Sequence, residues 1–332
     1  MPGSAVLRFS DPDKYGAFVR GTKAEVTVTK PGLFEAKLIR VDLHRLWMQR
    51  YSETLPRIAH FDHIPGRAFF MFETHAGPAM LVDGAETPPG SVMRHPERYS
   101  AFLRSLGPSQ FASMSLPIGD MQDLGATMAG CDLTPPREPL HCIPAPAAIQ
   151  RLQSLHAAAG DLAEHAPRVI ACPEAARGLE QALIGALVDC IGPDSSLAVP
   201  ANAGHATVMK KFFAILEEGP DRVVHLTEMC RRIGVSRRLL SACCNKALGM
   251  GPYHYLRLRQ MHLARRGLLM ADAAATTVTE VATAHGFWEL GRFAVAYRAL
   301  FGESPSATLR TPPGSGGDAA ALANFSLQAQ FA

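Results

Sequence analysis

The sequence predicts an α+β protein of more than one domain, in which an antiparallel β-sandwich or barrel is followed by an all-α region. Three observations favour this fold class. The chain of 332 residues is longer than one ordinary domain. Short alternating runs separated by proline and glycine fill residues 20–120, whereas the sequence from about Pro146 is alanine-rich and helix-prone. Beyond the segment Gly192–Gly204, only helical patterns and short turns occur up to Arg310.

Four N-terminal runs are expected to be strands, because β-prone residues alternate with polar ones between turn signals. They are Ala24–Thr29, Leu33–Leu43, Arg67–Thr74 and Ala79–Gly84. The segment Val82–Pro96 is expected to supply a hairpin, a Pro-Gly turn and a return strand.

Two helices are expected next, the second starting at Pro173, since proline suits the first position of a helix. An apolar stripe recurs at every fourth residue of this second helix and consists of Leu179, Leu183, Leu187 and Ile191. The stripe either packs on the sheet or serves self-association, which makes residues 146–204 a candidate dimerisation and linker segment. The expected domains are therefore 1–145, 146–204 and 205–312, with a loosely ordered tail over 313–332.

The composition is that of a soluble globular protein, with 47% hydrophobic and 19% charged residues. No run reaches the roughly 18 apolar residues that a membrane span needs, and the first residues lack the pattern of a secretory signal. The seven cysteines are odd in number and form no C-x-x-C pair, which indicates reduced thiols rather than disulfides or a zinc site. We therefore expect a cytoplasmic protein.

The net charge of +3 is unevenly distributed along the chain. Residues 205–312 contain 15 lysines and arginines against 8 acidic residues, so this region carries +7 and the remainder −4. A basic region beside a mildly acidic one favours a polyanionic partner for the basic region. A solvated charged face is the alternative, which charge alone does not exclude.

The segment Leu226–Gly249 has the pattern of two short helices that cross at a tight turn. Thr227 is expected to cap the first helix, Gly234 to turn the chain with a positive φ, and Ser236 to cap the second helix. The small Cys230 lets the two helices approach closely. This arrangement is a helix-turn-helix, whose second helix can enter a DNA major groove.

The same plan recurs about 52 residues later in the sequence. Gly286 corresponds to Gly234, a short helix precedes it, and a second helix is expected over Glu289–Leu300. Between the two copies, Pro252–Met270 is a candidate helix of about 28 Å, since each residue adds ~1.5 Å. This length approaches the ~34 Å of one DNA turn, so two recognition helices can enter successive major grooves.

Residues 205–310 resemble the duplicated helix-turn-helix domain of the AraC/XylS transcriptional regulators. The second copy carries the family's most characteristic pattern, VTEVATAHGF followed by F, Y and LFGESPS. The resemblance implies a cupin-like antiparallel β-barrel or jelly roll plus helices in front of the DNA-binding domain, which would sense an effector or mediate dimerisation. The ending GFWELGRF…LFGE also resembles the subgroup that includes the ethanolamine-operon regulator.

The resemblance places DNA-contacting residues on both recognition helices. In the first copy they are Arg237, Arg238, Ser241, Ala242, Asn245 and Lys246, and in the second Glu289, Leu290, Gly291, Arg292, Val295 and Arg298. Arginine can read guanine and asparagine adenine, each with ~1–3 kcal/mol of discrimination, while Arg237, Lys246 and Arg298 suit phosphate contacts. Ala242 can touch at most a thymine methyl and Gly291 offers no group, so each copy has few side chains that distinguish bases.

The other conspicuous residues of this region have structural interpretations. The aromatic and large apolar residues of the second copy are expected to form its core: Phe287, Phe293, Tyr297, Leu300 and Phe301. Trp288 is expected to be partly buried beside the turn. Phosphate contact and plain solvation remain equally open for the arginines of the connecting helix, Arg257, Arg259, Arg265 and Arg266.

Three rival functions fit parts of the sequence less well. A metal-dependent cupin-type enzyme would need closely spaced histidines, a glutamate and a later histidine, and the sequence offers these residue types without that spacing: His60, His63, Glu73, His75 and His95. We therefore expect no metal, no cofactor and no catalytic residue. A DNA-repair alkyl-transfer protein would need a four-cysteine zinc site near the N-terminus, but the first cysteine is Cys131. An effector-independent architectural DNA-binding protein would not need the sizeable sheet domain.

The sequence thus predicts a sequence-specific DNA-binding transcription regulator of the AraC type that is not an enzyme. In keeping with the resemblance, we expect an activator that binds a double-stranded DNA operator as a homodimer, with RNA polymerase as a candidate partner. A small-molecule effector, which the sequence does not identify, is expected in the N-terminal domain. Inward-facing candidates for its pocket are Trp47, Phe70 and Phe72, for which core packing is the alternative.

Overall fold

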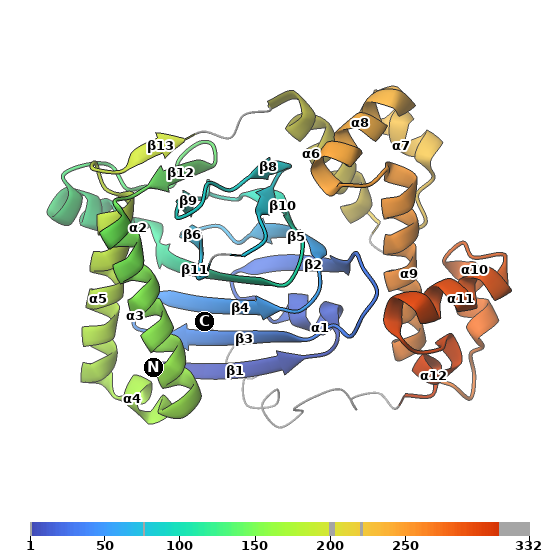
Figure 1. Cartoon of the computed structure of the whole chain (residues 1–332), viewed down its shortest axis with the longest axis horizontal. Coiled ribbons are helices and arrows are strands. Elements are labelled where there is room, and N and C mark those ends of the chain that lie inside the picture. The colour runs from blue at the N-terminus through green and yellow to red at the C-terminus, as the bar shows by residue number, and fades with distance from the viewer. Residues whose placement is uncertain (1, 76, 199–202, 220–221, 312–332) are drawn as a thin grey trace.

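The computed structural model describes residues 2–75, 77–198, 203–219 and 222–311, so the tail expected over 313–332 lies outside the described residues. A strand-rich part lies between a layer of helices on one side and a purely helical C-terminal part on the other (Figure 1). The antiparallel sheets followed by helices confirm the predicted fold class. Among the described helices, none has the length and apolar character required to cross a membrane.

Two antiparallel sheets face each other and form a β-sandwich. In order across the sheet, the larger consists of β1 (Gly3–Phe9), β3 (Ala36–Asp42), β4 (Trp47–Glu53), β11 (Ser109–Pro117), β6 (Arg67–Glu73), β9 (Val92–Arg94), β12 (Leu140–Ile143) and β13 (Ser196–Ala198). The smaller consists of β2 (Thr22–Val28), β5 (Arg57–His63), β10 (Ser100–Ser105), β7 (Met80–Val82) and β8 (Ala85–Glu86). An apolar core between them includes Leu38, Phe61, Met71 and Phe111.

The four predicted strands are present as β2, β3, β6 and β7, with slightly different ends. Segment 82–96 contains the β7–β8 hairpin and then β9, which crosses to the larger sheet and pairs with β6 and β12. The sequence-based strands do not include β1, β4, β5 or β10 to β13. In β4 and β5, polar residues occupy buried positions and hide the strand pattern. Arg57, for example, is fully buried and donates to the Glu53 carboxylate at 2.8 Å and to the Leu103 carbonyl at 3.0 Å.

Helices cover the outer face of the larger sheet (Figure 1). They are α3 (Pro146–His165), α4 (Pro167–Ala171) and α5 (Pro173–Ile191), while α2 (Ile118–Leu124) and a π-helical turn (Gly125–Ala129) lie at its end. Helix α5 begins at Pro173, as predicted. Leu183 and Leu187 are fully buried in the core between sheet and helices, so the apolar stripe packs within the chain and does not face a second subunit.

The C-terminal part is helical throughout its described residues. It contains α6 (Ala203–Glu217), α7 (Leu226–Ile233), α8 (Arg237–Leu248), α9 (Pro252–Met270), α10 (Val278–Ala284), α11 (Leu290–Phe301) and α12 (Pro305–Leu309). Helix α9 connects two small groups of helices that lie at its opposite ends, α6–α8 at one and α10–α12 at the other (Figure 1).

The C-terminal part packs directly on the smaller sheet. Ile58 of β5 and Phe102 of β10 belong to the same apolar core as the side chains of α6–α8. The rings of Phe102 and Phe213 stack with their centroids 5.0 Å apart. Gly84, in the β7–β8 turn, has a φ of 80°, and a Cβ there would meet the Ala247 backbone at 3.1 Å. A larger residue at this position would push α8 away from the sheet.

His156 of α3 makes the stability of the sheet–helix layer pH-dependent. It is fully buried against Phe72, and burial lowers the pKa of its imidazole to about 3. The ordinary pKa of histidine, about 6.5, applies to the unfolded chain. Below pH 6.5 the unfolded state therefore binds more protons than the folded state, so stability falls as the pH drops from about 6.5 toward 3.

We expect the substitution His156→Leu to reduce the loss of unfolding free energy between neutral pH and about pH 5, as measured by urea unfolding. Replacing the exposed His254 by leucine is the control and leaves the pH dependence unchanged. Identical pH dependence in His156→Leu and the wild type would contradict the assignment.

Candidate nucleic-acid interface

The first helix-turn-helix consists of α7 and α8. Gly234 has a φ of 80°, and the Ser236 hydroxyl accepts a hydrogen bond from the Leu239 amide, both as predicted. The prediction of Thr227 as the N-cap is wrong, because α7 begins at Leu226. Its N-cap is His225, whose side chain makes no capping hydrogen bond. Met229 and Leu240 are fully buried between the two helices, so one face of α8 is fixed and the other points outward.

The second helix-turn-helix consists of α10 and α11 and repeats this geometry. Thr277 and Glu280 form a capping box at the start of α10, and Gly286 has a φ of 79°. Phe287, Phe293 and Tyr297 are buried, as predicted. The Tyr297 hydroxyl donates to the Thr308 Oγ1 at 2.8 Å and ties α11 to α12.

The predicted DNA-contacting residues lie mostly on the solvent side of α8 and α11. On α8, Ser241 is half-buried and the exposed members are Arg237, Arg238, Ala242, Asn245 and Lys246. On α11 and its N-cap, the exposed members are Glu289, Leu290, Gly291, Arg292, Val295 and Arg298. The Arg292 Nη1 lies 2.8 Å from the Glu289 Oε2. Such an exposed ion pair contributes little to stability, so both side chains can turn toward a ligand.

Trp288 differs from the sequence-based expectation. Its side chain is 79% exposed, whereas partial burial beside the turn was predicted. The neighbouring Phe287 fills the core in its place and is fully buried. The indole therefore lies in solvent directly before α11, next to Glu289, and adds an aromatic group to the recognition face that the sequence pattern did not reveal.

The arginines of α9 are neither free for phosphate contact nor simply solvated, which were the two alternatives left open by the sequence. Three of them form ion pairs with the strand-rich part of the chain. The Arg259 Nε lies 2.8 Å from Glu25 Oε1, the Arg265 Nη1 2.7 Å from Asp11 Oδ2, and the Arg266 Nη2 2.6 Å from Asp13 Oδ1. Their charge is directed at the β-sandwich, so neither phosphate contact nor plain solvation describes them.

Arg257, the fourth of these residues, stabilises the turn of the second helix-turn-helix. Its guanidinium lies 3.7 Å above the centroid of the Phe287 ring, and Nη1 donates to the Gly286 carbonyl at 3.1 Å. The connecting helix is thereby joined both to the recognition unit at its end and to the sheet along its side.

A cavity of about 70 Å³ lies inside the β-sandwich. Its wall is mostly apolar and includes Val26, Phe61, Met71, Leu103 and Phe111. Polar groups on the wall are paired with one another: the Tyr15 hydroxyl donates to the Glu53 Oε1 at 2.7 Å, and the His63 Nε2 lies 2.6 Å from the His95 Nδ1. Burial lowers the pKa of His63 to about 3, so its ring is neutral at neutral pH.

Of the three residues predicted to line an effector pocket, one lies on the cavity wall and two lie elsewhere. Phe70 contributes to the cavity wall and also to the core under the helices. Phe72 packs edge-on against His156 in that second core, and it is not among the residues around the cavity. Trp47 also lies outside the cavity wall, because its indole is held between the guanidinium groups of Arg20 and Arg67, at 3.8 and 3.5 Å.

Strand β5 connects the cavity with the helical part. Its residues alternate, so Ala59 and Phe61 face the cavity while Ile58 and His60 face α6. On β10, Leu103 lines the cavity and Phe102 stacks on Phe213. A displacement of these strands at the cavity therefore also displaces the side chains that contact the helical part.

Known proteins resemble mainly the C-terminal part of the chain. Residues 229–311 match a family described as a helix-turn-helix domain. The chain is 41% identical over 98 residues to the probable thc operon regulatory protein of Rhodococcus erythropolis, and 38% identical over 95 residues to the XylDLEGF operon transcriptional activator 1 of Pseudomonas putida. These matches cover only 30% and 29% of the relatives' own lengths. The C-terminal part therefore contains a helix-turn-helix domain.

Two solved structures align with most of the chain at low similarity. The AraC-like transcriptional activator CuxR is 14% identical with a TM-score of 0.39, over 85% of this chain and 99% of its own. ToxT from Vibrio cholerae is 10% identical with a TM-score of 0.28, over 93% of this chain and 97% of its own.

The ion pair between Glu25 and Arg259 is expected to stabilise the docked arrangement. The Arg259 side chain is 4% exposed and that of Glu25 is 30% exposed. Removing the Glu25 carboxylate therefore deprives the largely buried guanidinium group of this counter-charge. We expect Glu25→Gln to lower the unfolding free energy of the full chain by about 1–3 kcal/mol in denaturant titrations. The exposed Glu86→Gln on the same sheet is the matched control and leaves it unchanged. Equal stability of the two variants would show that the pair contributes nothing.

Proposed function

We propose that the protein is a cytoplasmic, sequence-specific DNA-binding transcription regulator of the AraC type, and that it activates transcription. The observation that supports this is the pair of helix-turn-helix units at the two ends of α9, each with its recognition face in solvent. The two named relatives are an operon regulatory protein and an operon transcriptional activator, and they align over 30% and 29% of this chain.

In this proposal the two recognition helices divide affinity and specificity between them. Arg237, Lys246 and Arg298 contact phosphates, which supplies salt-dependent affinity without sequence preference. Arg238, Asn245 and Arg292 carry groups that can bond base edges. The exposed ring of Trp288 offers an apolar surface beside them, suited to a thymine methyl or a sugar.

An effector in the cavity of the β-sandwich would control this activity. The apolar wall favours a compact, largely apolar molecule, and the paired histidines His63 and His95 offer a hydrogen-bonding group. Phe70 remains the effector-contacting candidate from the sequence. Because β5 and β10 carry cavity residues on one face and contacts to the helical part on the other, a bound molecule would bias the docking of α6 and α9.

A homodimer and contacts with RNA polymerase are further parts of the proposal. Helices α3 and α5 lie on the side of the molecule opposite the helix-turn-helix units (Figure 1). A second copy can pack against their outer faces without covering the DNA-binding surface. In this proposal the outer faces of α3 and α5, and not the buried apolar stripe, supply the dimer interface expected within residues 146–204.

The base-reading role of Arg292 can be separated from general affinity by substitution. We expect Arg292→Ala to lower binding to a site selected from random DNA, with little effect on random DNA itself, because one base contact worth ~1–3 kcal/mol is lost. Lys246→Ala is expected to weaken binding to the selected site and to random DNA by the same factor. It is also expected to reduce the number of counterions released on binding by about one. Fluorescence anisotropy at several salt concentrations measures both effects.

Arg137→Ala, which removes an exposed arginine from the loop before β12, is the control for the lost charge and leaves the affinities for selected and random DNA unchanged. Equal losses on selected and random DNA for Arg292→Ala would rule out its role as a base reader. Wild-type protein that selects no sequence from random DNA would overturn the proposed function.

A further inference from the structure

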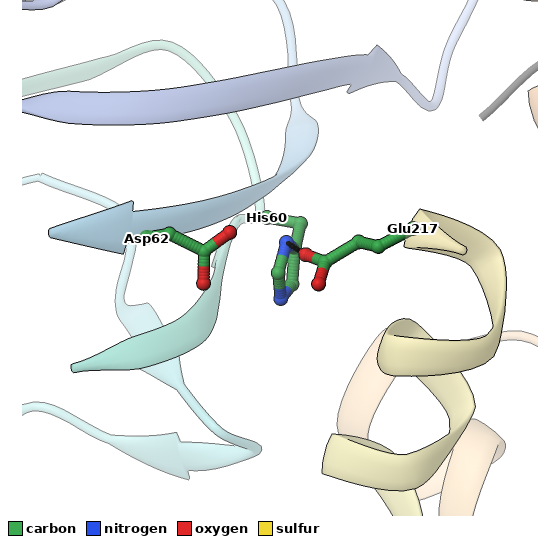
Figure 2. Close-up of side chains that lie close together, drawn as sticks. All are labelled: His60, Asp62 and Glu217. Carbon is green, nitrogen blue, oxygen red and sulfur yellow. Dashed lines mark ion pairs between the residues drawn. The ribbon is translucent and has the colours of Figure 1, made fainter. Parts of the chain in front are cut away.

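Three metal-ligating side chains meet where the β-sandwich contacts the helical part. His60 and Asp62 project from the same face of β5, and Glu217 comes from the last turn of α6 (Figure 2). One ligand atom of each residue lies within 4.8 Å of the other two. Figure 2 shows the two carboxylates on either side of the imidazole, so that all three groups point into one small volume.

The imidazole of His60 is held with its Nδ1 toward this volume. The Ser100 Oγ lies 3.2 Å from the Nε2 on the other side of the ring, and the ring stacks on Phe213 with centroids 4.8 Å apart. Nδ1 is 2.6 Å from the Glu217 Oε1. A hydrogen-bonding partner on the far nitrogen is how ligating histidines are commonly oriented toward a metal.

The local charge also favours a cation. Two carboxyl groups converge on one imidazole at this point. Lys23 lies opposite Asp62 in the strand register, and its exposed ammonium group supplies one positive charge beside the two carboxyl groups. A divalent cation bound here would offset the remaining negative charge of the two carboxylates.

We propose that His60, Asp62 and Glu217 form a binding site for a divalent first-row transition-metal ion, with zinc as the best match. One imidazole nitrogen and two carboxylate oxygens are a donor set that such ions accept, with water completing the coordination. Two bonds of about 2.0–2.2 Å span at most about 4.4 Å, so the Glu217 carboxylate has to move away from Nδ1 and any wider separation within the group, which reaches up to 4.8 Å, has to close slightly. Glu217 is half-exposed at the end of α6 and has the freedom to do so.

The metal would connect the two parts of the chain. His60 and Asp62 belong to the smaller sheet, whereas Glu217 belongs to the helix that leads into the first helix-turn-helix. An ion bound by all three holds the docked arrangement and is lost when the parts separate. Metal binding therefore stabilises the docked, folded chain by mass action.

This site differs from the histidine group considered in the sequence. Of that group it contains His60, while His63 lies on the inner face of β5 and pairs with His95 inside the β-sandwich. Glu217, the third ligand, is 155 residues away from Asp62 in sequence, and no local spacing would reveal it.

The test uses full-length protein treated with a chelator and then titrated with zinc or cobalt(II), with thermal unfolding and visible absorbance as readouts. We expect a saturable rise in Tm with zinc, and a cobalt(II) spectrum without thiolate charge-transfer bands, since no cysteine takes part. Asp62→Asn and Glu217→Gln, which keep size and hydrogen-bonding capacity, are expected to weaken the apparent metal affinity at least about tenfold.

Glu218→Gln, the same change at the residue directly after α6, is the matched control and retains wild-type metal binding. No rise in Tm with either metal would overturn the proposal. Undiminished affinity in both Asp62→Asn and Glu217→Gln would also overturn it, as would thiolate bands in the cobalt(II) spectrum, because the metal would then be bound elsewhere. The outcome does not depend on DNA binding, so it is independent of the proposed function.

Discussion

The packing of the helical part on the smaller sheet is the constraint on which the rest of the structure depends. The core of the first helix-turn-helix is completed by Ile58 and Phe102, which belong to the β-sandwich. Helix α9, which joins the two recognition units, is held along its length by ion pairs to Glu25, Asp11 and Asp13. The spacing and orientation of the two recognition helices are therefore set in part by a domain that carries neither of them.

This arrangement gives a physical route from an interior cavity to a DNA-binding surface. The two faces of β5 serve different neighbours, since Phe61 lines the cavity and His60 contacts Glu217 of α6. A strand has little freedom to move one face without the other, because its side chains alternate on a single backbone. Coupling therefore needs only a small shift of β5 and β10, and no rearrangement of the fold.

Local rules in the sequence predicted the elements that depend on local chemistry. The two glycine turns, the Ser236 cap, the proline start of α5 and the buried aromatic residues of the second unit all follow from residue type and spacing. Strands β4 and β5 could not be predicted in this way. Their buried polar residues, such as Glu53 and Arg57, are compatible with a core only because they pair with each other.

The contacts between the two parts were beyond prediction from a single sequence. Arg259 and Glu25 are 234 residues apart, and nothing in either local pattern distinguishes an ion pair from a solvated charge. The same applies to Trp288, whose exposure depends on Phe287 taking the core position. The recognition faces were predictable because a helix-turn-helix is a local motif, whereas the surface against which it docks is not.

The most direct test of the central claim is the spacing dependence of DNA binding. Two recognition units held at a fixed separation should contact two groups of bases about one helical turn, or about 10 base pairs, apart on the same face of the duplex. We expect that inserting about 5 base pairs between the two halves of a selected site abolishes specific binding, because the second half then faces away. Retention of full affinity after this insertion would contradict a rigidly docked pair of recognition helices.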